Sequence, residues 1–366
     1  MKKNSNKKKI LIAPLNWGLG HATRCIPIIN ALLKEGFEPI LAGDGDSLKL
    51  LQKEFSKLKS YHLPSYNIKY TKSGKNLKYK LLFNAPQIIK AVKKEQEVVH
   101  KIIEREGITG LICDNRFGVY SKKIPSVYIT HQIHVLSGFS TFLTSKIHQR
   151  IISKFDECWI PDYGSNPNLA GKLSDSKSLK LPLKYIGPLS RFNIEIPSKE
   201  GMTNNKRYDL LILLSGPEPQ RSLLEKKLLE ELKSYSKRVL FIRGIIPDKE
   251  KVNQEIISKN KHIKFIDFML QSDLQIAINE SELIISRSGY STIMDLEKLG
   301  AKVFFIPTSG QFEQEYLAKY LEYQNIAPFV SQDNFNIKML EEVKNYKGFT
   351  RKIRVNENQI PLIIFK

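Results

Sequence analysis

Short apolar runs alternate with segments of helical periodicity along this chain, and most of the runs end at a glycine or a polar residue. In the first half the apolar runs lie at 9–15, 38–42, 109–113, 125–130 and 157–160. Helical patterns lie at 22–35, 47–57 and 86–106. Strands buried on both faces show such continuous apolar runs, and intervening helices connect parallel strands. The first half is therefore predicted to form a parallel α/β sheet.

A second series of the same kind follows the segment 180–193, which contains prolines and a glycine, and the polar residues after it. Its strands are expected at 208–216, 238–244, 262–269, 282–289 and 301–310, and its helices at 221–234, 271–279, 290–299 and 313–324. Two doubly wound sheets leave a cleft between their carboxyl ends, where open α/β sheets bind ligands. We expect Rossmann-like domains at 1–187 and 188–350 and a tail at 351–366.

The composition is that of a globular protein, with 366 residues of which 41% are hydrophobic and 26% charged. We find no apolar run of the roughly 18–20 residues that a membrane-spanning helix needs, and no convincing signal peptide. Cys25, Cys113 and Cys158 are far apart and lie in or beside apolar segments. This pattern indicates a reducing compartment, with neither disulfides nor a zinc site. These features predict a cytoplasmic protein.

Basic residues are in excess, with 58 Lys and Arg against 37 Asp and Glu and a net charge of +21. Such a field favours polyanions, anionic lipid surfaces or phosphorylated substrates, although solvated lysines also serve solubility. The segment 66–83 places tyrosines among lysines. That pattern suits a nucleic acid or an anionic membrane surface.

The turn after the first strand, "NWGLGHATR" at 16–24, combines glycines with a histidine and an arginine. A strand followed by a glycine turn and a helix directs backbone N–H groups toward an anion. One alternative is a dinucleotide-dependent oxidoreductase, in which Gly18 and Gly20 open the fingerprint and Asp44 binds the ribose. The third glycine of that fingerprint is absent, because Thr23 stands in its place.

Three strand-to-helix turns of the second half carry polar residues suited to an anionic ligand with many hydroxyls. Glycine at a helix start admits a phosphate closely, and carboxamides and carboxylates pair with hydroxyls. Each turn alone also has a structural explanation, such as a cap or compensation of the helix dipole. The three sets are Ser215, Gly216 and Arg221; Arg287, Ser288, Gly289 and Asp295; and Gln311, Glu313, Gln314 and Glu315.

The motifs "GLGHATR", "SRSGYSTIMD" and "IPTSGQFEQEYLA", taken in this order, resemble GT-B glycosyltransferases of the MurG and family 28 kind. The resemblance covers most of the chain. It implies the GT-B fold, two Rossmann-like domains facing a central cleft. It also implies an inverting, metal-independent hexosyltransferase that uses a nucleotide sugar, expected to be a UDP sugar, and no further cofactor. The chain departs from relatives at "SGPEPQ", where they have a glycine-rich turn, at Asp295, where many have glutamate, and at Gln314-Glu315, where they have two glutamines.

The resemblance also implies roles for single residues. Ser288 and Gly289 would bind the diphosphate and Asp295 the ribose. The base would lie against Phe268 and Met269, and the sugar against Gln314 and Glu313. The remaining residues of the expected donor set are Gly20, Ser215, Gly216, Arg221, Arg287 and Gln311. The expected acceptor-binding residues are Asn16, Arg24, Asn115 and His131.

Sugar transfer needs a base for the acceptor hydroxyl, and His21 and Asp114 are the two candidates. Both follow predicted strands at their carboxyl ends. His21 titrates near neutrality without help, whereas Asp114 would need a raised pKa or a histidine partner. The structural alternatives are a capping histidine and an Asx-turn at Asp114–Asn115.

No metal site is predicted. His131 and His134 form an H-x-x-H pair without a third ligand, and "GDGD" at 43–46 follows the second strand of a βα series. Because many relatives glycosylate lipids, we favour a lipid-linked or cell-envelope acceptor. For the same reason we favour a peripheral position on the inner face of the membrane over nucleic-acid binding. The sequence is also compatible with a nucleotide-sugar 2-epimerase of the same fold and with a binding module.

Overall fold

The structure, a computed structural model, describes residues 7–66, 85–138, 141–175, 181–192, 206–245, 261–350 and 360–366. The segment 67–83, with most of the predicted tyrosine and lysine pattern, lies outside the described residues. Among the described residues, the chain divides into two compact units. The first contains the residues up to Leu189 together with 360–366, and the second begins at Ser190. The predicted division fell after residue 187, with the C-terminal tail on its own.

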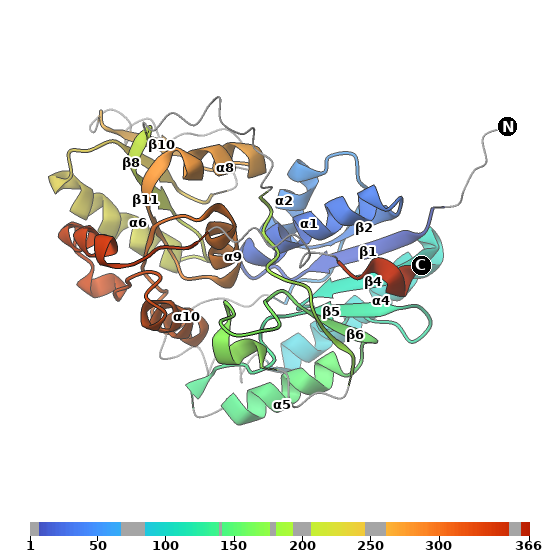
Figure 1. Ribbon diagram of the computed structural model, residues 1–366. Helices are drawn as coiled ribbons and strands as arrows, with labels where there is room; N and C mark the ends of the chain where they lie inside the picture. The colour runs from blue at the N-terminus through green and yellow to red at the C-terminus, as the bar shows by residue number, and fades with distance from the viewer. Residues whose placement is uncertain are drawn as a thin grey trace. The chain divides into compact units, whose positions relative to one another are not determined.

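The first unit is built on a parallel sheet of seven strands in the order β3-β2-β1-β4-β5-β6-β7 (Figure 1). Every neighbouring pair in it is parallel. The strands are β1 (Lys9–Pro14), β2 (Glu38–Gly43), β3 (Ser60–His62), β4 (Ile108–Asp114), β5 (Ser126–Ile129), β6 (Glu157–Ile160) and β7 (Leu183–Tyr185). The parallel α/β prediction is confirmed for this half.

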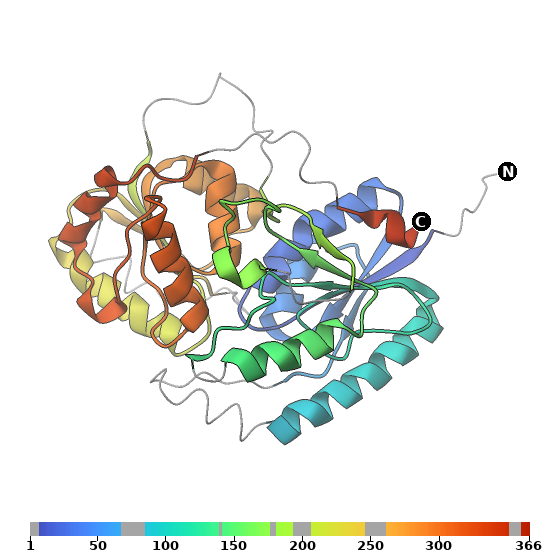
Figure 2. The same ribbon diagram turned by 60° about the horizontal axis from the view of Figure 1, so that its bottom comes forward.

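Helices cover both faces of this sheet. They are α1 (Gly20–Lys34), α2 (Gly45–Glu54), α4 (Ala85–Glu106) and α5 (Thr141–Ile152). Val99 of α4 and Ile152 of α5 pack with Leu11 and Tyr128 in one hydrophobic cluster. Figure 2 shows α4 and α5 side by side on that face, with α1 on the other side of the sheet.

Two strands and one α-helix of this unit were not predicted, and each lacks the expected apolar pattern. The strands β3 and β7 have three residues each and lie at the two edges of the sheet, where most of their side chains are only half-buried. The helix α5 buries the polar side chains of Ser145 and His148, while Phe142 and Leu143 are exposed. Its pattern is therefore the reverse of an ordinary amphipathic helix.

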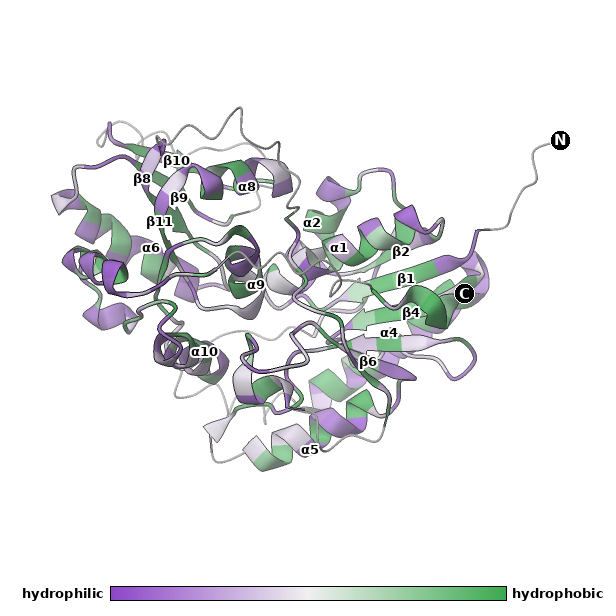
Figure 3. Ribbon diagram, in the orientation of Figure 1, coloured by the Kyte–Doolittle hydropathy of each residue, from purple (hydrophilic) through white to green (hydrophobic). Residues whose placement is uncertain are grey.

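The second unit contains a parallel sheet of five strands in the order β10-β9-β8-β11-β12. The strands are β8 (Tyr208–Leu213), β9 (Val239–Ile242), β10 (Ile263–Ile266), β11 (Ser281–Ser286) and β12 (Val303–Phe305). The helices are α6 (Gln220–Glu231), α8 (Gln271–Asn279), α9 (Tyr290–Leu299) and α10 (Phe312–Tyr323). Figure 3 shows apolar residues along the strands of the first sheet and polar residues on many outer helix surfaces. The predicted second parallel sheet is confirmed.

The C-terminal residues return to the first unit. Phe365 packs against Gly110 of β4, where an added Cβ would lie 2.4 Å from its ring. Its ring also makes an edge contact with Trp159 of β6 at 6.3 Å between centroids, and the Lys8 ammonium donates to its carbonyl oxygen at 3.1 Å. Across the described ranges, no helix combines the length and the apolar character that crossing a bilayer requires.

Candidate active site

The turn after β1 places two polar side chains at the carboxyl end of that strand. Gly18 has φ +80°, a left-handed conformation that glycine adopts without strain. The Ser47 hydroxyl of α2 lies 3.2 Å from the carbonyl oxygens of both Leu15 and Gly18 and fixes the turn. Because α1 begins at Gly20, His21 and Arg24 lie three residues apart in its first turns and share one face.

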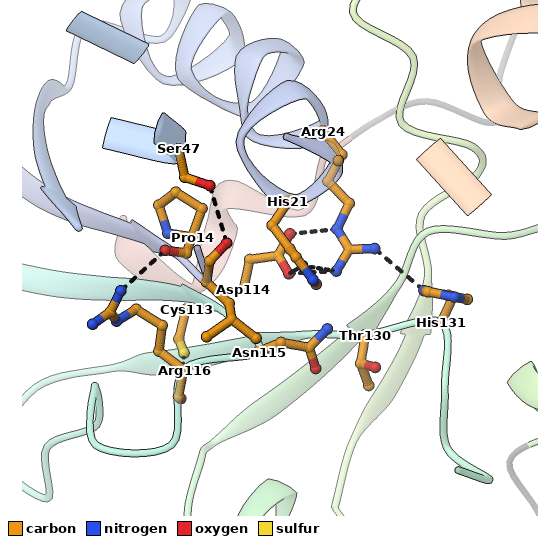
Figure 4. A network of polar contacts seen from close by, with 12 residues as sticks. Pro14, His21, Arg24, Ser47, Cys113, Asp114, Asn115, Arg116, Thr130 and His131 are labelled. Carbon is orange, nitrogen blue, oxygen red and sulfur yellow. Dashed lines mark hydrogen bonds and ion pairs between the residues drawn. The ribbon is translucent and has the colours of Figure 1, made fainter. Parts of the chain in front are cut away.

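Asp114, the last residue of β4, receives both of these side chains. Pro14 of β1 is its partner in the strand register, so Asp114 lies beside the start of the turn. His21 Nδ1 lies 2.7 Å from Asp114 Oδ1, and the Arg24 guanidinium donates to both carboxylate oxygens. Figure 4 shows His21 and Arg24 directed toward this carboxylate. The two predicted base candidates are therefore one hydrogen-bonded pair.

The charges around Asp114 determine the proton positions. Burial alone would raise its pKa, but the charges and hydrogen bonds of Arg24 and His21 lower the pKa below its ordinary value. An ionised carboxylate can only accept hydrogen bonds. His21 Nδ1 lies 2.7 Å from this carboxylate and 2.8 Å from Arg24 Nη2. Because Arg24 Nη2 donates to Asp114 Oδ1, the ionised carboxylate favours the His21 tautomer that donates through Nδ1–H and keeps the lone pair on Nε2. Its side chain is 16% exposed, whereas Asp114 is fully buried.

His131, which follows β5, joins the same cluster through Arg24. Arg24 Nη1 lies 3.2 Å from His131 Nδ1. Arginine has no acceptor atom, so His131 accepts at Nδ1 and carries its hydrogen on Nε2. The cluster thus holds two histidines in opposite tautomers, one with a basic Nε2 and one with an Nε2–H donor.

A second buried network lies beside the first. Arg116, two residues after Asp114, donates to Glu95 at 2.5 Å, to Asp44 at 2.6 Å and to the carbonyl oxygen of Pro64 at 2.7 Å. Asn16 approaches Asp44 at 3.4 Å. Arg116 and Glu95 were not predicted from the sequence. The one signal for them was a carboxylate at the position of Glu95 on the apolar face of the predicted helix.

The "GDGD" segment is part of this network. Asp44 pairs with Arg116, and Asp46 is exposed and pairs with Lys49 at 3.8 Å. Within the part of the chain that the structure describes, no three His, Cys, Asp or Glu side chains gather as metal ligands. Metal independence of the reaction stays a prediction.

The predicted donor residues of the second unit lie at the carboxyl ends of its strands. Gly216, after β8, has φ +102° and open space around it. Gly289 is the N-cap residue directly before α9 and Gln311 is that before α10, and neither caps its helix through a side-chain hydrogen bond. Their first backbone N–H groups are the positive end of a helix dipole. Ser215, Phe268, Met269 and Glu313 are half-buried in the loops or first turns at this end.

The loop before α10 is held by its own side chains. The Ser288 hydroxyl donates to the carbonyl oxygen of Gln314 at 2.7 Å. The Gln314 side chain accepts from the Thr308 N–H at 2.8 Å, and Glu315 accepts from the Gly310 N–H at 2.9 Å. Glu315, which stands where relatives have the second of two glutamines, is therefore one of the residues that shape this loop.

Three further predicted donor residues, beside Ser288 and Gln314, have internal partners that the sequence did not reveal. Asp295 is 4% exposed, and it accepts from the Ser190 hydroxyl at 2.8 Å and from Arg191 Nε at 3.0 Å. Burial raises its pKa, although Arg191 opposes this. Arg221 is neutralised by Glu218 and Glu225. The ligand contacts of Asp295 and Arg221 stay predictions.

Arg287, the third, differs from Arg221 in the charge of its partners. It donates to the carbonyl oxygens of Ile306, Pro307 and Gln220 at 3.0 Å and to the Gln332 amide at 2.7 Å. All four acceptors are neutral, and no carboxylate of the described residues forms an ion pair with it. Burial lowers its pKa to about 10. A buried positive charge therefore lies directly before Ser288 and the start of α9.

Comparison with known proteins identifies glycosyltransferases as the proteins that this chain resembles. The model of the glycosyltransferase family 28 C-terminal domain matches residues 220–349, within the second unit. A UDP-N-acetylglucosamine–N-acetylmuramyl-(pentapeptide) pyrophosphoryl-undecaprenol N-acetylglucosamine transferase of Haemophilus influenzae is 25% identical, over 94% of this chain and 91% of the relative. An uncharacterized glycosyltransferase of Methanosarcina acetivorans is 23% identical, over 94% and 92%.

Solved structures show the same fold at lower identity. MurG of Acinetobacter baumannii has a TM-score of 0.52 at 14% identity, over 92% of this chain and 89% of that one. The glycosyltransferase of kitacinnamycin has a TM-score of 0.61 at 12% identity, over the same shares. The expected fold class and enzyme class are therefore confirmed. The chain is a glycosyltransferase with the GT-B fold, and it is similar to MurG and to the family 28 C-terminal domain.

Proposed function

We propose that this enzyme transfers a hexosyl group from a UDP sugar to a hydroxyl of a lipid-linked or cell-envelope acceptor, with inversion and without a metal ion. The name of the Haemophilus relative specifies a UDP-N-acetylglucosamine donor and a pyrophosphoryl-undecaprenol acceptor. The sugar and the acceptor of this chain are inferred from that relative at the level of chemical class only.

The observation that carries the proposal is the His21–Asp114 pair. As the acceptor oxygen attacks the anomeric carbon, His21 Nε2 takes its proton and the bond from that carbon to the diphosphate breaks. The buried Asp114 carboxylate stabilises the imidazolium that forms. A single displacement of this kind inverts the anomeric carbon, and general base catalysis contributes about 10²–10⁴-fold.

The second unit supplies groups for the departing diphosphate. The helices α9 and α10 begin directly after the carboxyl ends of β11 and β12, and helix N-termini bind phosphates. The charge of Arg287, with which no carboxylate of the described residues pairs, lies next to the start of α9 and adds to that field. Preorganised groups of this kind commonly supply several kcal/mol of transition-state stabilisation, so no metal ion is required by the proposal.

A membrane surface is proposed as the partner of α5. Phe142, Leu143 and Ile147 are 75%, 60% and 50% exposed. Lys146 lies over the Phe142 ring at 5.3 Å, and the helix ends with Arg150 in its last turn. Exposed apolar side chains flanked by basic residues suit an anionic bilayer surface, and the chain carries +21 overall.

The test is a UDP-release assay with purified enzyme. The donors are UDP-glucose, UDP-galactose and UDP-N-acetylglucosamine; the acceptors are octyl β-D-glucoside and dioleoylglycerol in phosphatidylglycerol vesicles. We expect acceptor-dependent UDP release that persists in EDTA. Loss of turnover in EDTA would overturn metal independence. Epimerised UDP sugar in the absence of acceptor would indicate the 2-epimerase instead.

A further inference from the structure

Tyr128 and His148 form a buried polar pair beneath the candidate active site, and neither has a part in the reaction described above. Tyr128 is on β5 and His148 on α5, and both are buried. The Tyr128 hydroxyl donates to Asn115 Oδ1 at 3.0 Å and lies 3.0 Å from His148 Nε2. A hydroxyl has one hydrogen to donate. With that hydrogen donated to Asn115, His148 is the donor through Nε2–H, and its buried Nδ1 has no hydrogen-bond partner among the described residues. The hydrogen bonds then run from His148 through Tyr128 to Asn115.

The backbone of Asn115 is fixed from both sides. Asn115 has φ +58°, a left-handed conformation that asparagine tolerates better than most residues. Asp114 before it is held by Arg24, and Arg116 after it is held by Glu95. The freedom left to Asn115 is the orientation of its side-chain amide. Tyr128 determines that orientation by binding the oxygen.

The nitrogen of this amide is thereby directed away from Tyr128. Figure 4 shows the Asn115 amide nitrogen on the side of Arg24 and His21, and its oxygen on the opposite side. Asn115 itself is half-buried, and its amide nitrogen lies on the same side as the His21–Asp114 pair. They can donate only to a hydrogen-bond acceptor such as a hydroxyl or ether oxygen.

We infer that Tyr128, held by His148, is a positioning residue that keeps the N–H groups of Asn115 directed at an oxygen of the sugar or alcohol acceptor. This inference deepens the proposed function and rests on it. The bound oxygen belongs to the same acceptor molecule whose reacting hydroxyl loses its proton to His21. Without the Tyr128 hydroxyl, the Asn115 amide can rotate about its Cβ–Cγ bond. Its own oxygen then faces the acceptor oxygen and repels it.

The helix α5 supports both sides of this arrangement. His148 reaches Tyr128 from its buried face, and Ser145 of the same face accepts from the Val135 N–H at 3.0 Å. Val135 lies in the loop that follows His131. The unusual burial of polar side chains on α5 is explained by these contacts.

The first test compares Tyr128→Phe with Tyr61→Phe. Both variants remove one buried or half-buried tyrosine hydroxyl from the first unit, but Tyr61 binds Glu106 at the far edge of the sheet. Loss of one hydrogen bond to substrate predicts an increase of about three- to tenfold in KM for octyl β-D-glucoside in Tyr128→Phe. The value of kcat, its pH profile and KM for the UDP sugar should be unchanged. Tyr61→Phe should match the wild type throughout.

A double-mutant cycle tests whether Tyr128 acts through Asn115. The variant Asn115→Gly keeps the left-handed backbone and removes the amide, so adding Tyr128→Phe to it should cause no further change in KM. An additive effect would overturn the inference. Should Tyr128→Phe fail to fold, the pair His148→Gln and His148→Leu replaces it. The variant His148→Gln keeps a hydrogen-bond donor and should have a KM near that of the wild type. The variant His148→Leu has no donor and should have a higher KM.

A binding measurement separates this inference from the proposed reaction. In protein with 15N-labelled asparagine, octyl β-D-glucoside below its micelle concentration should shift the side-chain amide signal of Asn115 saturably. The shift should persist in His21→Ala and weaken at least about threefold in Tyr128→Phe. Absence of a saturable shift, or equal affinity in Tyr128→Phe, would overturn the inference. Normal turnover of His21→Ala would instead overturn the proposed base.

Discussion

His21 Nδ1 lies 2.7 Å from Asp114 Oδ1, although the two residues are 93 positions apart in the chain. The strand register that aligns Pro14 with Asp114 brings them together. Arg24 completes the arrangement, because its charge keeps the buried carboxylate ionised. The carboxylate in turn holds the histidine in the tautomer with a basic Nε2. The position of each of these three side chains therefore depends on the other two.

Replacing the histidine should remove the base while leaving the donor site intact. We expect His21→Ala to lower kcat by about 10²–10⁴-fold, with the Kd of UDP unchanged by calorimetry. His62→Ala is the matched control, since His62 is an exposed histidine at the end of β3 in the same sheet. Turnover of His21→Ala within about threefold of the control would show that the base lies elsewhere, because the expected loss is far larger.

Variants of Asp295 and Arg191 distinguish an effect on stability from an effect on ligand binding. Removing either partner of this buried pair should lower the free energy of unfolding by about 3 kcal/mol or more. If Asp295 also accepts from the ribose, Asp295→Ala should in addition weaken UDP binding by about 10- to 150-fold. Arg191→Ala should keep UDP affinity near that of the wild type. Equal UDP affinity in the two variants would contradict the ribose contact.

Much of the fold could be predicted from the sequence because strands buried on both faces appear in it as continuous apolar runs. Runs such as "ILIAPL" and "YDLLILL" correspond to β1 and β8. The edge strands β3 and β7 show no such run, since most of their residues are only half-buried. The helix α5 was not predicted because polar residues on its buried face interrupt the apolar periodicity by which helices are recognised.

The site was predictable as a set of residues and not as a set of contacts. The positions of His21 and Asp114 at strand ends placed them on one edge of the sheet. Their pairing, and the use of Arg24 as a counter-ion, depend on a register that the pattern does not specify. Likewise, nothing in the sequence indicated that Asp295 binds Arg191 or that Arg287 binds backbone oxygens.

The buried histidine of α5 should make stability depend on pH. Burial lowers the pKa of His148 to about 4 from 6.5. The unfolded chain therefore binds the proton at a higher pH than the folded chain, and stability falls as the pH decreases from 6.5 toward 4. Lowering the pH from about 7.5 to about 5 should therefore reduce the free energy of unfolding by about 2 kcal/mol through His148.

The measurement is urea unfolding of the wild type and His148→Gln across this pH range. Glutamine does not titrate, so the difference in unfolding free energy between the two proteins should change by about 2 kcal/mol from about pH 7.5 to pH 5. Other titrating groups are common to both proteins and cancel in the difference. A difference that is constant with pH would show that His148 is not buried in its neutral form.

The exposed face of α5 should determine membrane binding. Replacing Phe142 and Leu143 together by serine removes two exposed apolar side chains, each worth on the order of 1 kcal/mol if half of its surface enters the bilayer. The bound fraction on phosphatidylglycerol vesicles should therefore fall about tenfold or more in flotation. Leu223→Ser is the control, because Leu223 is 41% exposed on α6 of the other unit; this variant should leave flotation unchanged.

The variant Lys146→Glu should weaken vesicle binding at low salt and lose this effect at high salt, since screening removes the attraction of surface charges. Equal flotation of the serine variant and the wild type would exclude α5 as the membrane-binding surface.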